Sequence, residues 1–249
     1  MRILLVNDDG FYADGLLALA RVLADKHEVI ISAPAEEQSA KSHALSLFKK
    51  IKIERVALPV KNIIEAWKIY GTPVDCVKIY LEGISPFKKP DLVVSGINSG
   101  ENLGTDVIYS GTLGGAREGF LHGIPSIALS LNIDSVMSYS ETAEIFLNIL
   151  PELLSFGNGT PFLNVNFPQQ LRDNRPVIAY TVVGRRDYIN ACKFFEENGE
   201  RYCEIAGRMV DDNGVNFDTQ AVKKGYISVT PLITDATDYG SLGQWQGIP

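Results

Sequence analysis

The chain contains little of several features that define familiar protein classes. Its 249 residues include only three cysteines, Cys76, Cys192 and Cys203, too few and too widely spaced for a disulfide framework or a zinc site. No apolar run approaches the roughly 18–20 residues of a membrane span. The short apolar start ends at Asp8 and Asp9, unlike a signal peptide. We therefore expect reduced thiols, a cytoplasmic location and no membrane partner.

An excess of basic residues is also missing. Lys and Arg number 23 against 30 Asp and Glu, which gives a formal net charge of -7. Proteins that bind polymeric nucleic acid depend on a basic face that contacts the phosphates. The short pairs Lys49-Lys50 and Lys88-Lys89 are typical of solvated turns. We expect no polymeric nucleic acid as a partner.

The composition indicates one globular unit. Hydrophobic residues make up 45% of the chain and charged residues 21%, which is ordinary for a globular domain. A chain of this length forms one or two domains. Because no linker, repeat or low-complexity tract divides the sequence, we expect a single domain over residues 1–249.

The first 33 residues predict a βαβ unit. The apolar run 2–6 predicts a buried strand that ends in the turn 7–10. Residues 16–24 have the broad apolar face of a helix, and 28–33 form the next apolar run. Strand, helix and strand in this order imply a parallel sheet with a right-handed crossover.

The same rhythm continues along the chain. Further elements are expected as a strand or hairpin arm at 45–56, strands at 66–70, 91–95, 126–131, 162–167, 177–182, 202–206 and 226–231, and helices at 73–80, 112–121 and 140–154. We therefore predict an α/β fold with a three-layer, doubly wound and mostly parallel sheet, Rossmann-like, with a β-rich C-terminal elaboration. A β arm is expected around 185–206, followed by a C-terminal tail at 232–249.

Oxygen donors gather at the predicted strand ends. Asp8 and Asp9 repel each other unless a cation or hydrogen-bond donors lie between them, and Gly10 gives the chain freedom to turn both toward one ion. Asn98 lies in the glycine-rich loop after the strand 91–95. Such donors favour a hard cation, Mg²⁺, Mn²⁺ or Ca²⁺. The alternative is a solvated acidic turn.

A second group of residues predicts an anion site. Two carboxylates only neutralise a divalent ion, so a dianionic substrate needs further contacts. Ser110, Gly111 and Thr112 stand at the start of a predicted helix, where free N–H groups and hydroxyls bind phosphate. The simpler alternative is that Ser110 only caps the helix. A metal beside such a helix end suggests phosphoryl chemistry with metal-activated water.

Other site types fail on spacing. The glycines at 96, 100 and 104 match neither the dinucleotide fingerprint nor a Walker A loop. His27, His43 and His122 are too scattered for a histidine-based metal site, although His43 is a weaker candidate contact for an anion.

The order of the motifs resembles the survival protein SurE family of metal-dependent 5′-nucleotidases. The matching segments are Asn7-Asp8-Asp9-Gly10, Ala33-Pro34 with Ser39-Ala40, Gly71 to Val77, Pro90 to Gly119, Asn164 to Pro168 and Thr230-Pro231-Leu232. The resemblance implies a SurE-like phosphatase domain with one divalent cation held by Asp8, Asp9, Ser39 and Asn98. Ser39 enters the set through the resemblance. It also implies a homodimer or homotetramer with exchanged C-terminal segments.

We therefore expect a metal-dependent phosphomonoesterase acting on nucleoside 5′-monophosphates, and also on 3′ esters. Asp8, Asp9 and Asn98 are the expected catalytic residues, and Ser110, Gly111 and Thr112 hold the phosphoryl group. One alternative is a nucleotide-sensing protein with little turnover, suggested by Gly114-Gly115, which should loosen the helix by roughly 1–2 kcal/mol. The other alternative is a short-chain polyphosphatase.

Overall fold

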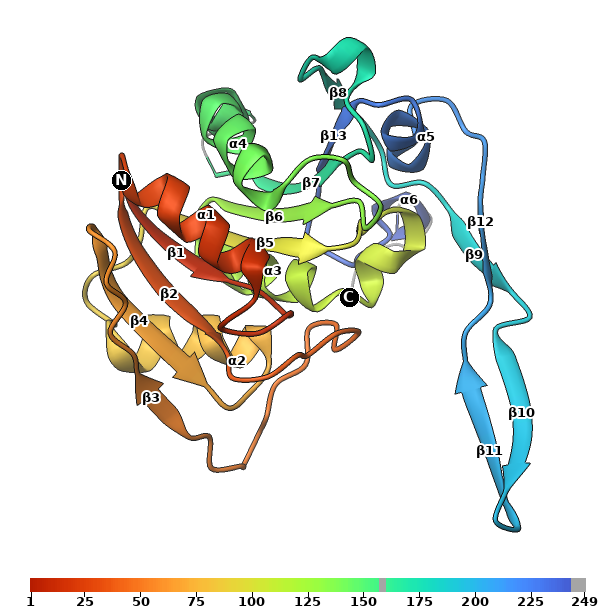
Figure 1. The fold of residues 1–249 in the computed structure, drawn as a ribbon, viewed down its shortest axis with the longest axis horizontal. Coiled ribbons are helices and arrows are strands. Elements are labelled where there is room, and N and C mark those ends of the chain that lie inside the picture. The colour runs from red at the N-terminus through yellow and green to blue at the C-terminus, as the bar shows by residue number, and fades with distance from the viewer. Residues whose placement is uncertain (157–159, 243–249) are drawn as a thin grey trace.

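The computed structural model describes residues 1–156 and 160–242, which build one central sheet and the helices that cover it (Figure 1). The strand order is β3-β4-β2-β1-β5-β6-β7-β13-β8. Six neighbouring strands are parallel, namely β4 (Ile63–Ile69), β2 (Glu28–Pro34), β1 (Arg2–Val6), β5 (Leu92–Ser99), β6 (Ser126–Leu131) and β7 (Phe162–Phe167). β3 (Ile53–Arg55) is antiparallel to β4, β13 (Ile227–Pro231) is antiparallel to β7, and β8 (Ile178–Tyr180) lies parallel to β13.

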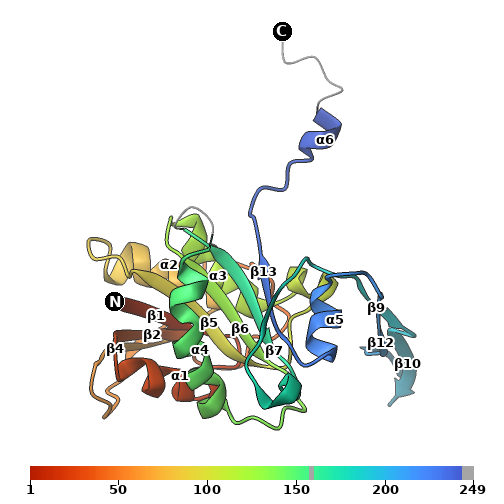
Figure 2. The same ribbon diagram turned by 90° about the horizontal axis from the view of Figure 1, so that it is seen from above.

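Helices cover both faces of the sheet. α1 (Asp14–Ala24) and α4 (Tyr139–Leu154) lie on one face, and α2 (Pro73–Lys78) and α3 (Gly111–Leu121) lie on the other (Figures 1 and 2). Alternate residues of a strand point to opposite faces, so Leu5 belongs to the core under α1 and α4 while Leu4 belongs to the core under α2. The predicted three-layer, doubly wound α/β fold is confirmed.

Two of these helices begin with local signals that the sequence displays. At α2 the Thr72 hydroxyl accepts the Asp75 N–H, the Asp75 carboxylate accepts the Thr72 N–H, and Pro73 occupies the first turn. Ser138 and Glu141 form the same reciprocal capping box at α4. Such caps stabilise the first turn by satisfying N–H groups that have no partner within the helix.

Several predicted boundaries are wrong. Within 45–56 only Ile53–Arg55 is a strand, and the residues before it form an irregular loop in which Ser42 and Phe48 have positive φ. β4 begins at Ile63 instead of Ala66. β5 continues to Ser99, so Asn98 lies in a strand instead of a loop. The helix after Pro73 continues beyond Lys78 as a π-helical segment, Ile79–Ile84.

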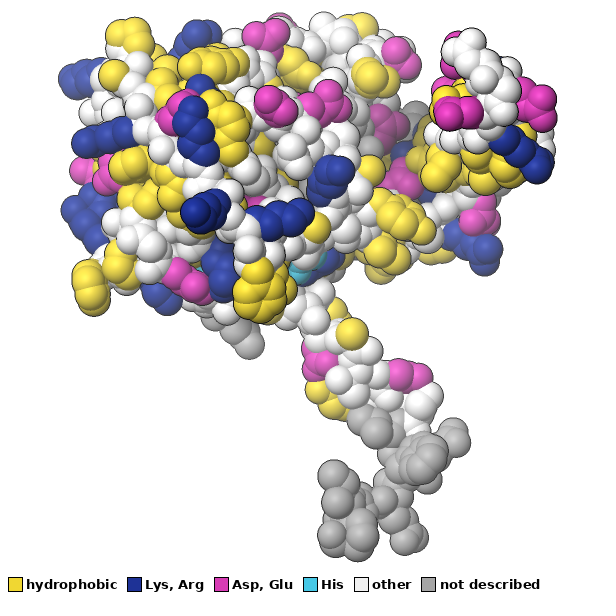
Figure 3. Space-filling view, turned by 90° about the horizontal axis from the view of Figure 1, so that it is seen from below, with side chains coloured by type: hydrophobic (Ala, Val, Ile, Leu, Met, Phe, Trp, Pro, Cys, Tyr) yellow, Lys and Arg dark blue, Asp and Glu magenta, His cyan; other side chains and the backbone are white. Residues whose placement is uncertain are grey.

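The C-terminal elaboration forms an arm and a tail. In the arm β9 (Arg186–Ile189) pairs with β12 (Arg208–Asp211), and beyond them β10 (Cys192–Glu197) pairs with β11 (Glu200–Ile205). This hairpin projects from the body (Figures 1 and 3). The arm expected at 185–206 thus continues to Asp211. All three cysteines are free thiols.

The tail leaves the body beyond β13 and ends in α6 (Tyr239–Leu242) (Figure 2). The last part of the predicted tail, 243–249, lies outside the described residues. Helix α5 (Asp218–Lys223), which the sequence did not predict, packs beside β13. Among the described helices none is both long and apolar enough to cross a membrane.

Candidate metal and phosphate site

The loops after β1, β2 and β5 meet at the carboxyl end of the sheet, where open α/β sheets bind ligands. Asp8 and Asp9 follow β1. The Gln38 N–H from the loop after β2 donates to the Asp8 carbonyl at 2.7 Å. The Ser99 N–H at the end of β5 donates to Asp9 Oδ2 at 3.2 Å. The acid pair is therefore held between its two neighbouring strands.

The first turn of α3 lies directly against Asp8. The Thr112 hydroxyl donates to Asp8 Oδ1 at 2.5 Å, and both side chains are buried. A Cβ added to Gly111 would stand 2.9 Å from Asp8 Oδ2, so this close approach requires glycine. The Ser110 hydroxyl caps the helix by accepting the Leu113 N–H at 3.1 Å. The structure thus brings Asp8 of the predicted metal set together with Gly111 and Thr112 of the predicted phosphate set.

The geometry changes the expected part played by Thr112. Its hydroxyl was expected to contact phosphate, but its side chain is fully buried and its hydrogen is donated to Asp8. Ser110 uses a lone pair for the cap and keeps its hydroxyl hydrogen for another acceptor. Gly111 contributes backbone alone. A phosphoryl group at this helix end would therefore meet Ser110 and Gly111, while Thr112 orients Asp8.

The acid pair is electrostatically uncompensated. Burial raises the pKa of Asp8, against the lowering effect of its hydrogen bonds from Thr112. Burial also raises the pKa of Asp9 to about 6, with further increases from the charges of Asp8 and Glu37. Among the described residues no Lys, Arg or His forms an ion pair with Asp8, Asp9 or Glu37. A divalent cation would supply the missing positive charge.

Ser39 and Asn98 can offer neutral oxygen atoms. The Ser39 hydroxyl donates its hydrogen to Glu37 Oε1 at 2.7 Å, which leaves its lone pairs unused by that bond. Asn98 donates through Nδ2 to the Gly100 carbonyl at 2.7 Å, which leaves Oδ1 available as an acceptor. In residues 1–156 and 160–242 no three His, Cys, Asp or Glu side chains gather as a metal site. A cation here therefore depends on two carboxylates and neutral oxygens.

An irregular stretch of β5 precedes Asn98. The pairing of β5 with β6 shifts between Ser95 and Asn98. At Gly96 φ is +146°, and an added Cβ would stand 2.2 Å from the Leu129 carbonyl oxygen, so only glycine fits. This shift in register sets the direction in which the strand presents Asn98 at the sheet edge.

The loop between β2 and β3 supports the phosphate side of the site. Ser42 donates its N–H to the Tyr109 carbonyl at 2.8 Å and its hydroxyl to the Ile108 carbonyl at 2.7 Å, immediately before the cap of α3. His43, considered as an anion contact, instead bonds through Nε2 to the buried Glu118 carboxylate at 2.8 Å. Sequence reasoning gave Glu118 no role in the site, although it is the only acidic residue of α3.

Comparisons with known proteins agree with this geometry. The family model described as "Survival protein SurE" matches residues 3–190. The 5′-nucleotidase SurE of Natranaerobius thermophilus is 42% identical, over 99% of this chain and 99% of the relative. That of Synechococcus elongatus is 39% identical, over 98% of each. The crystal structure of the SurE protein from Aquifex aeolicus matches with a TM-score of 0.81 and 34% identity, over 98% of this chain and 97% of the other.

Proposed function

The chain belongs to the survival protein SurE family, and from this premise we infer that the protein is a 5′-nucleotidase. It is a phosphomonoesterase that hydrolyses nucleoside 5′-monophosphates to a nucleoside and phosphate. The observation that carries this function is the contact between the buried Asp8 carboxylate and the first turn of α3. It sets a cation-attracting acid pair beside a helix end that attracts phosphate.

We propose that Asp8, Asp9, Ser39 and Asn98 hold one divalent cation, Mg²⁺ or Mn²⁺. All four side chains present oxygen, the donor that these ions prefer. The hydrogen bonds of Ser39 to Glu37 and of Asn98 to Gly100 fix both neutral side chains with oxygen lone pairs to spare. A bound divalent cation supplies Lewis-acid polarisation of the phosphoryl group and of the attacking water.

The protein's own groups bind and orient the substrate. The Ser110 hydroxyl and the Gly111 N–H would donate to phosphoryl oxygens at the N-terminus of α3. Thr112 keeps the Asp8 carboxylate in one orientation. Asp9 is more exposed than Asp8, and its Oδ2 accepts the Ser99 N–H. We propose that the other oxygen, Asp9 Oδ1, accepts a proton from the attacking water.

Phosphate release tests this function. The substrates are 5′- and 3′-nucleoside monophosphates and p-nitrophenyl phosphate, each with Mg²⁺, Mn²⁺ or EDTA. We expect release from the 5′-nucleotides that requires an ion and stops with EDTA. Release that is equally fast with EDTA would refute the metal site. A folded protein that binds nucleotides but releases no phosphate with any ion would favour the sensing alternative, and preferential cleavage of tripolyphosphate would favour the polyphosphatase.

We further propose that the protein assembles as a homodimer or homotetramer. The hairpin β10–β11 supports this proposal, because it projects from the body (Figure 1) and carries exposed apolar side chains. Phe194 is 62% exposed and Ile205 is 85% exposed. Apolar side chains gathered on a projecting element are typical of a surface that a partner covers.

A further inference from the structure

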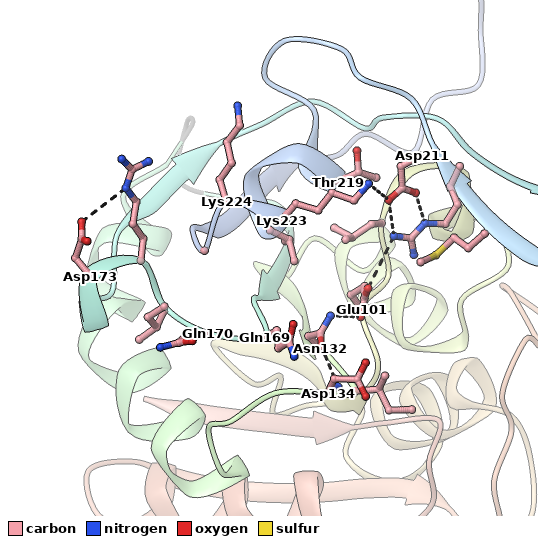
Figure 4. Close-up of a pocket in the computed structure, with 18 residues that line it drawn as sticks. Glu101, Asn132, Asp134, Gln169, Gln170, Asp173, Asp211, Thr219, Lys223 and Lys224 are labelled. Carbon is pink, nitrogen blue, oxygen red and sulfur yellow. Dashed lines mark hydrogen bonds and ion pairs between the residues drawn. The ribbon is translucent and has the colours of Figure 1, made fainter.

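Figure 4 shows a large hollow at the ends of β5, β6 and β7. Because the strand order is β1-β5-β6-β7, it lies on the other side of β5 from the acid pair that follows β1. Its volume is about 650 Å³, within the 300–1,000 Å³ that is usual for small-molecule sites. One wall comes from the segments that follow three neighbouring strands. Glu101 follows β5, Asn132 and Asp134 follow β6, and Gln169 follows β7. Arg186 and residues of α5 form the opposite wall.

The hollow begins within reach of the acid pair. The Ser99 N–H lies 3.2 Å from Asp9 Oδ2, and Glu101 is two residues farther along the chain. Because consecutive Cα atoms are 3.8 Å apart, the Glu101 backbone lies within roughly 10 Å of that carboxylate. The Gly100 N–H donates to the Leu131 carbonyl, so the chain between Ser99 and Glu101 lies beside the end of β6. A substrate whose phosphate lies at the acid pair can therefore extend along the strand ends into the hollow.

The charges of the lining exclude a second phosphate site. Four carboxylates and four basic side chains line the hollow, namely Glu101, Asp134, Asp173 and Asp211 with Arg172, Arg186, Lys223 and Lys224. Three of these four cations, those of Arg172, Arg186 and Lys223, already pair with carboxylates of the lining. Arg186 Nε lies 2.7 Å from Asp211 Oδ1, and Lys223 Nζ lies 3.2 Å from Asp211 Oδ2 (Figure 4). A balanced lining with paired cations suits a neutral, polar ligand.

The lining of the hollow offers both hydrogen bonds and apolar contact. Asn132 Nδ2 donates to Glu101 Oε2 at 3.0 Å, which fixes that carboxylate, and Gln169 lies next to Asn132 (Figure 4). In the described part of the chain the Gln169 side-chain amide has no hydrogen-bond partner, so its donor and its acceptor are both unused. Ile133 is 73% exposed and Met209 is 45% exposed along the same lining. These surfaces match a heteroaromatic ring with polar edges.

We propose that this hollow binds the base and ribose of the nucleoside monophosphate, with Gln169 as a specificity-determining residue. The inference rests on the proposed 5′-nucleotidase function. The other hollow near the acid pair, lined by Lys49 and Tyr70 among others, measures about 260 Å³. That volume is below the usual range for a small-molecule site, and the larger hollow also provides the unused amide.

Substitutions at Gln169 test the proposal on the full-length, metal-loaded enzyme. Gln169→Trp fills part of the hollow and Gln169→Ala removes one amide. The fold should tolerate both substitutions because the Gln169 side chain is exposed. We expect KM for nucleoside 5′-monophosphates to rise more than about tenfold for Gln169→Trp and about three- to tenfold for Gln169→Ala. Turnover of p-nitrophenyl phosphate, which has no nucleoside to place, should stay within twofold. Lys49→Trp in the smaller hollow is the matched control. It should leave KM and turnover unchanged for both substrates.

Two outcomes would overturn the proposal. In the first, the Gln169 variants lose activity equally with nucleotides and with p-nitrophenyl phosphate, which would mean that Gln169 acts on the acid pair or the fold. In the second, Lys49→Trp selectively raises KM for nucleotides, which would place the nucleoside in the smaller hollow. If the wild-type protein hydrolyses no phosphomonoester, the proposed function fails separately. Calorimetry with AMP and GMP then decides the site, since binding that is weakened at least tenfold by Gln169→Trp supports it and unchanged binding refutes it.

Discussion

Asp8 is the residue that joins the two halves of the site, because one carboxylate belongs to the acid pair and also accepts the Thr112 hydroxyl. We predict that Asp8→Asn lowers metal-dependent kcat/KM for a 5′-nucleotide by more than about 100-fold, since even residues that only support metal ligands cost 10–100-fold. The amide keeps an acceptor for Thr112 and removes a buried charge, so the melting temperature should change by only a few degrees. Steady-state kinetics and thermal unfolding check both parts.

The control for this variant is Asp25→Asn, an exposed aspartate just beyond α1. It should leave kinetics and melting temperature unchanged. Full metal-dependent activity in Asp8→Asn would show that the acid pair does not hold the ion.

The raised pKa of Asp9 makes a prediction about stability and pH. Burial and the charge of Asp8 raise this pKa from 3.8 to about 6. Between these values the folded state binds more protons than the unfolded state, so this group makes stability fall as pH rises from about 4 to 6. The effect is at most about 3 kcal/mol, and smaller after solvent screening of a partly exposed group. A bound cation should reverse it.

The measurement is a series of unfolding curves between pH 4 and 8, with EDTA or with Mg²⁺, on wild type and Asp9→Asn. The difference between the two proteins isolates Asp9 from other acids, such as Glu54, whose lowered pKa acts in the opposite direction. With EDTA, wild type should lose stability relative to Asp9→Asn as the pH rises, and Mg²⁺ should stabilise wild type most above pH 6. A pH-independent difference would argue against the burial of a charged Asp9.

At this scale the sequence predicted where Asp8 and Asp9 lie better than it predicted how Thr112 interacts. Asp8 and Asp9 are consecutive after an apolar run, so their place at the sheet edge follows from local sequence. The contact of Thr112 with Asp8 joins residues 104 positions apart and depends on how closely α3 packs. No local pattern encodes that distance, and for this reason Thr112 was assigned to phosphate.

At the scale of elements, α3 and the loop before β3 act together. The loop bonds to the carbonyls of Ile108 and Tyr109 through Ser42, and to Glu118 through His43. Gly114 and Gly115, which were expected to loosen α3, instead allow close packing. A Cβ on Gly114 would stand 2.3 Å from the Ser42 carbonyl oxygen, and one on Gly115 would stand 3.0 Å from Ser95 Oγ. Gly114 therefore lets the loop approach the helix, and Gly115 lets the helix approach β5.

We predict that Gly114→Ala destabilises the protein, although alanine favours a helix by about 1 kcal/mol over glycine. The clash with backbone at Ser42 should cost about 1–3 kcal/mol and should raise KM for the nucleotide by displacing the turn before Ser110. Urea unfolding and kinetics measure both effects. Gly83→Ala is the matched control, because an added Cβ there meets no atom within 4 Å. A Gly114→Ala protein that is more stable than wild type would contradict this packing.

The elements that the sequence predicted well are those with local causes. The helix starts at Pro73 and Tyr139 follow from capping residues, and the parallel strands follow from apolar runs. The segment 45–56 was predicted as a strand or hairpin arm from its alternating residues. Only Ile53–Arg55 pairs in the sheet, and the residues before it make irregular bonds such as that from the Ser46 N–H to Asp75 Oδ1. Those bonds come from tertiary structure and override alternation.

At the scale of the whole molecule, the parallel sheet and its two helical layers follow from the alternation of strands and helices along the chain, whereas the strands at the edges of the sheet do not. The six parallel strands bury both faces, and such strands are recognisable as continuous apolar runs. β8 has three residues, and β13 pairs antiparallel to β7 after a long excursion through the arm. The place of an edge strand depends on which elements remain unpaired, which composition does not specify.

The arm leads to a prediction about assembly. Ile189 and Arg208 are direct partners in the pairing of β9 with β12, so an Asn-Gly turn can replace residues 190–207 without moving either strand. Because β10 and β11 pair with each other and project from the body, the shortened chain should melt within a few degrees of wild type. If the exposed Phe194 and Ile205 contact another subunit, the mass of the shortened protein by light scattering should fall to that of a smaller assembly. The double variant Phe194→Asp and Ile205→Asp, which keeps the hairpin, should do the same, and an unchanged mass in both would locate the subunit contacts elsewhere.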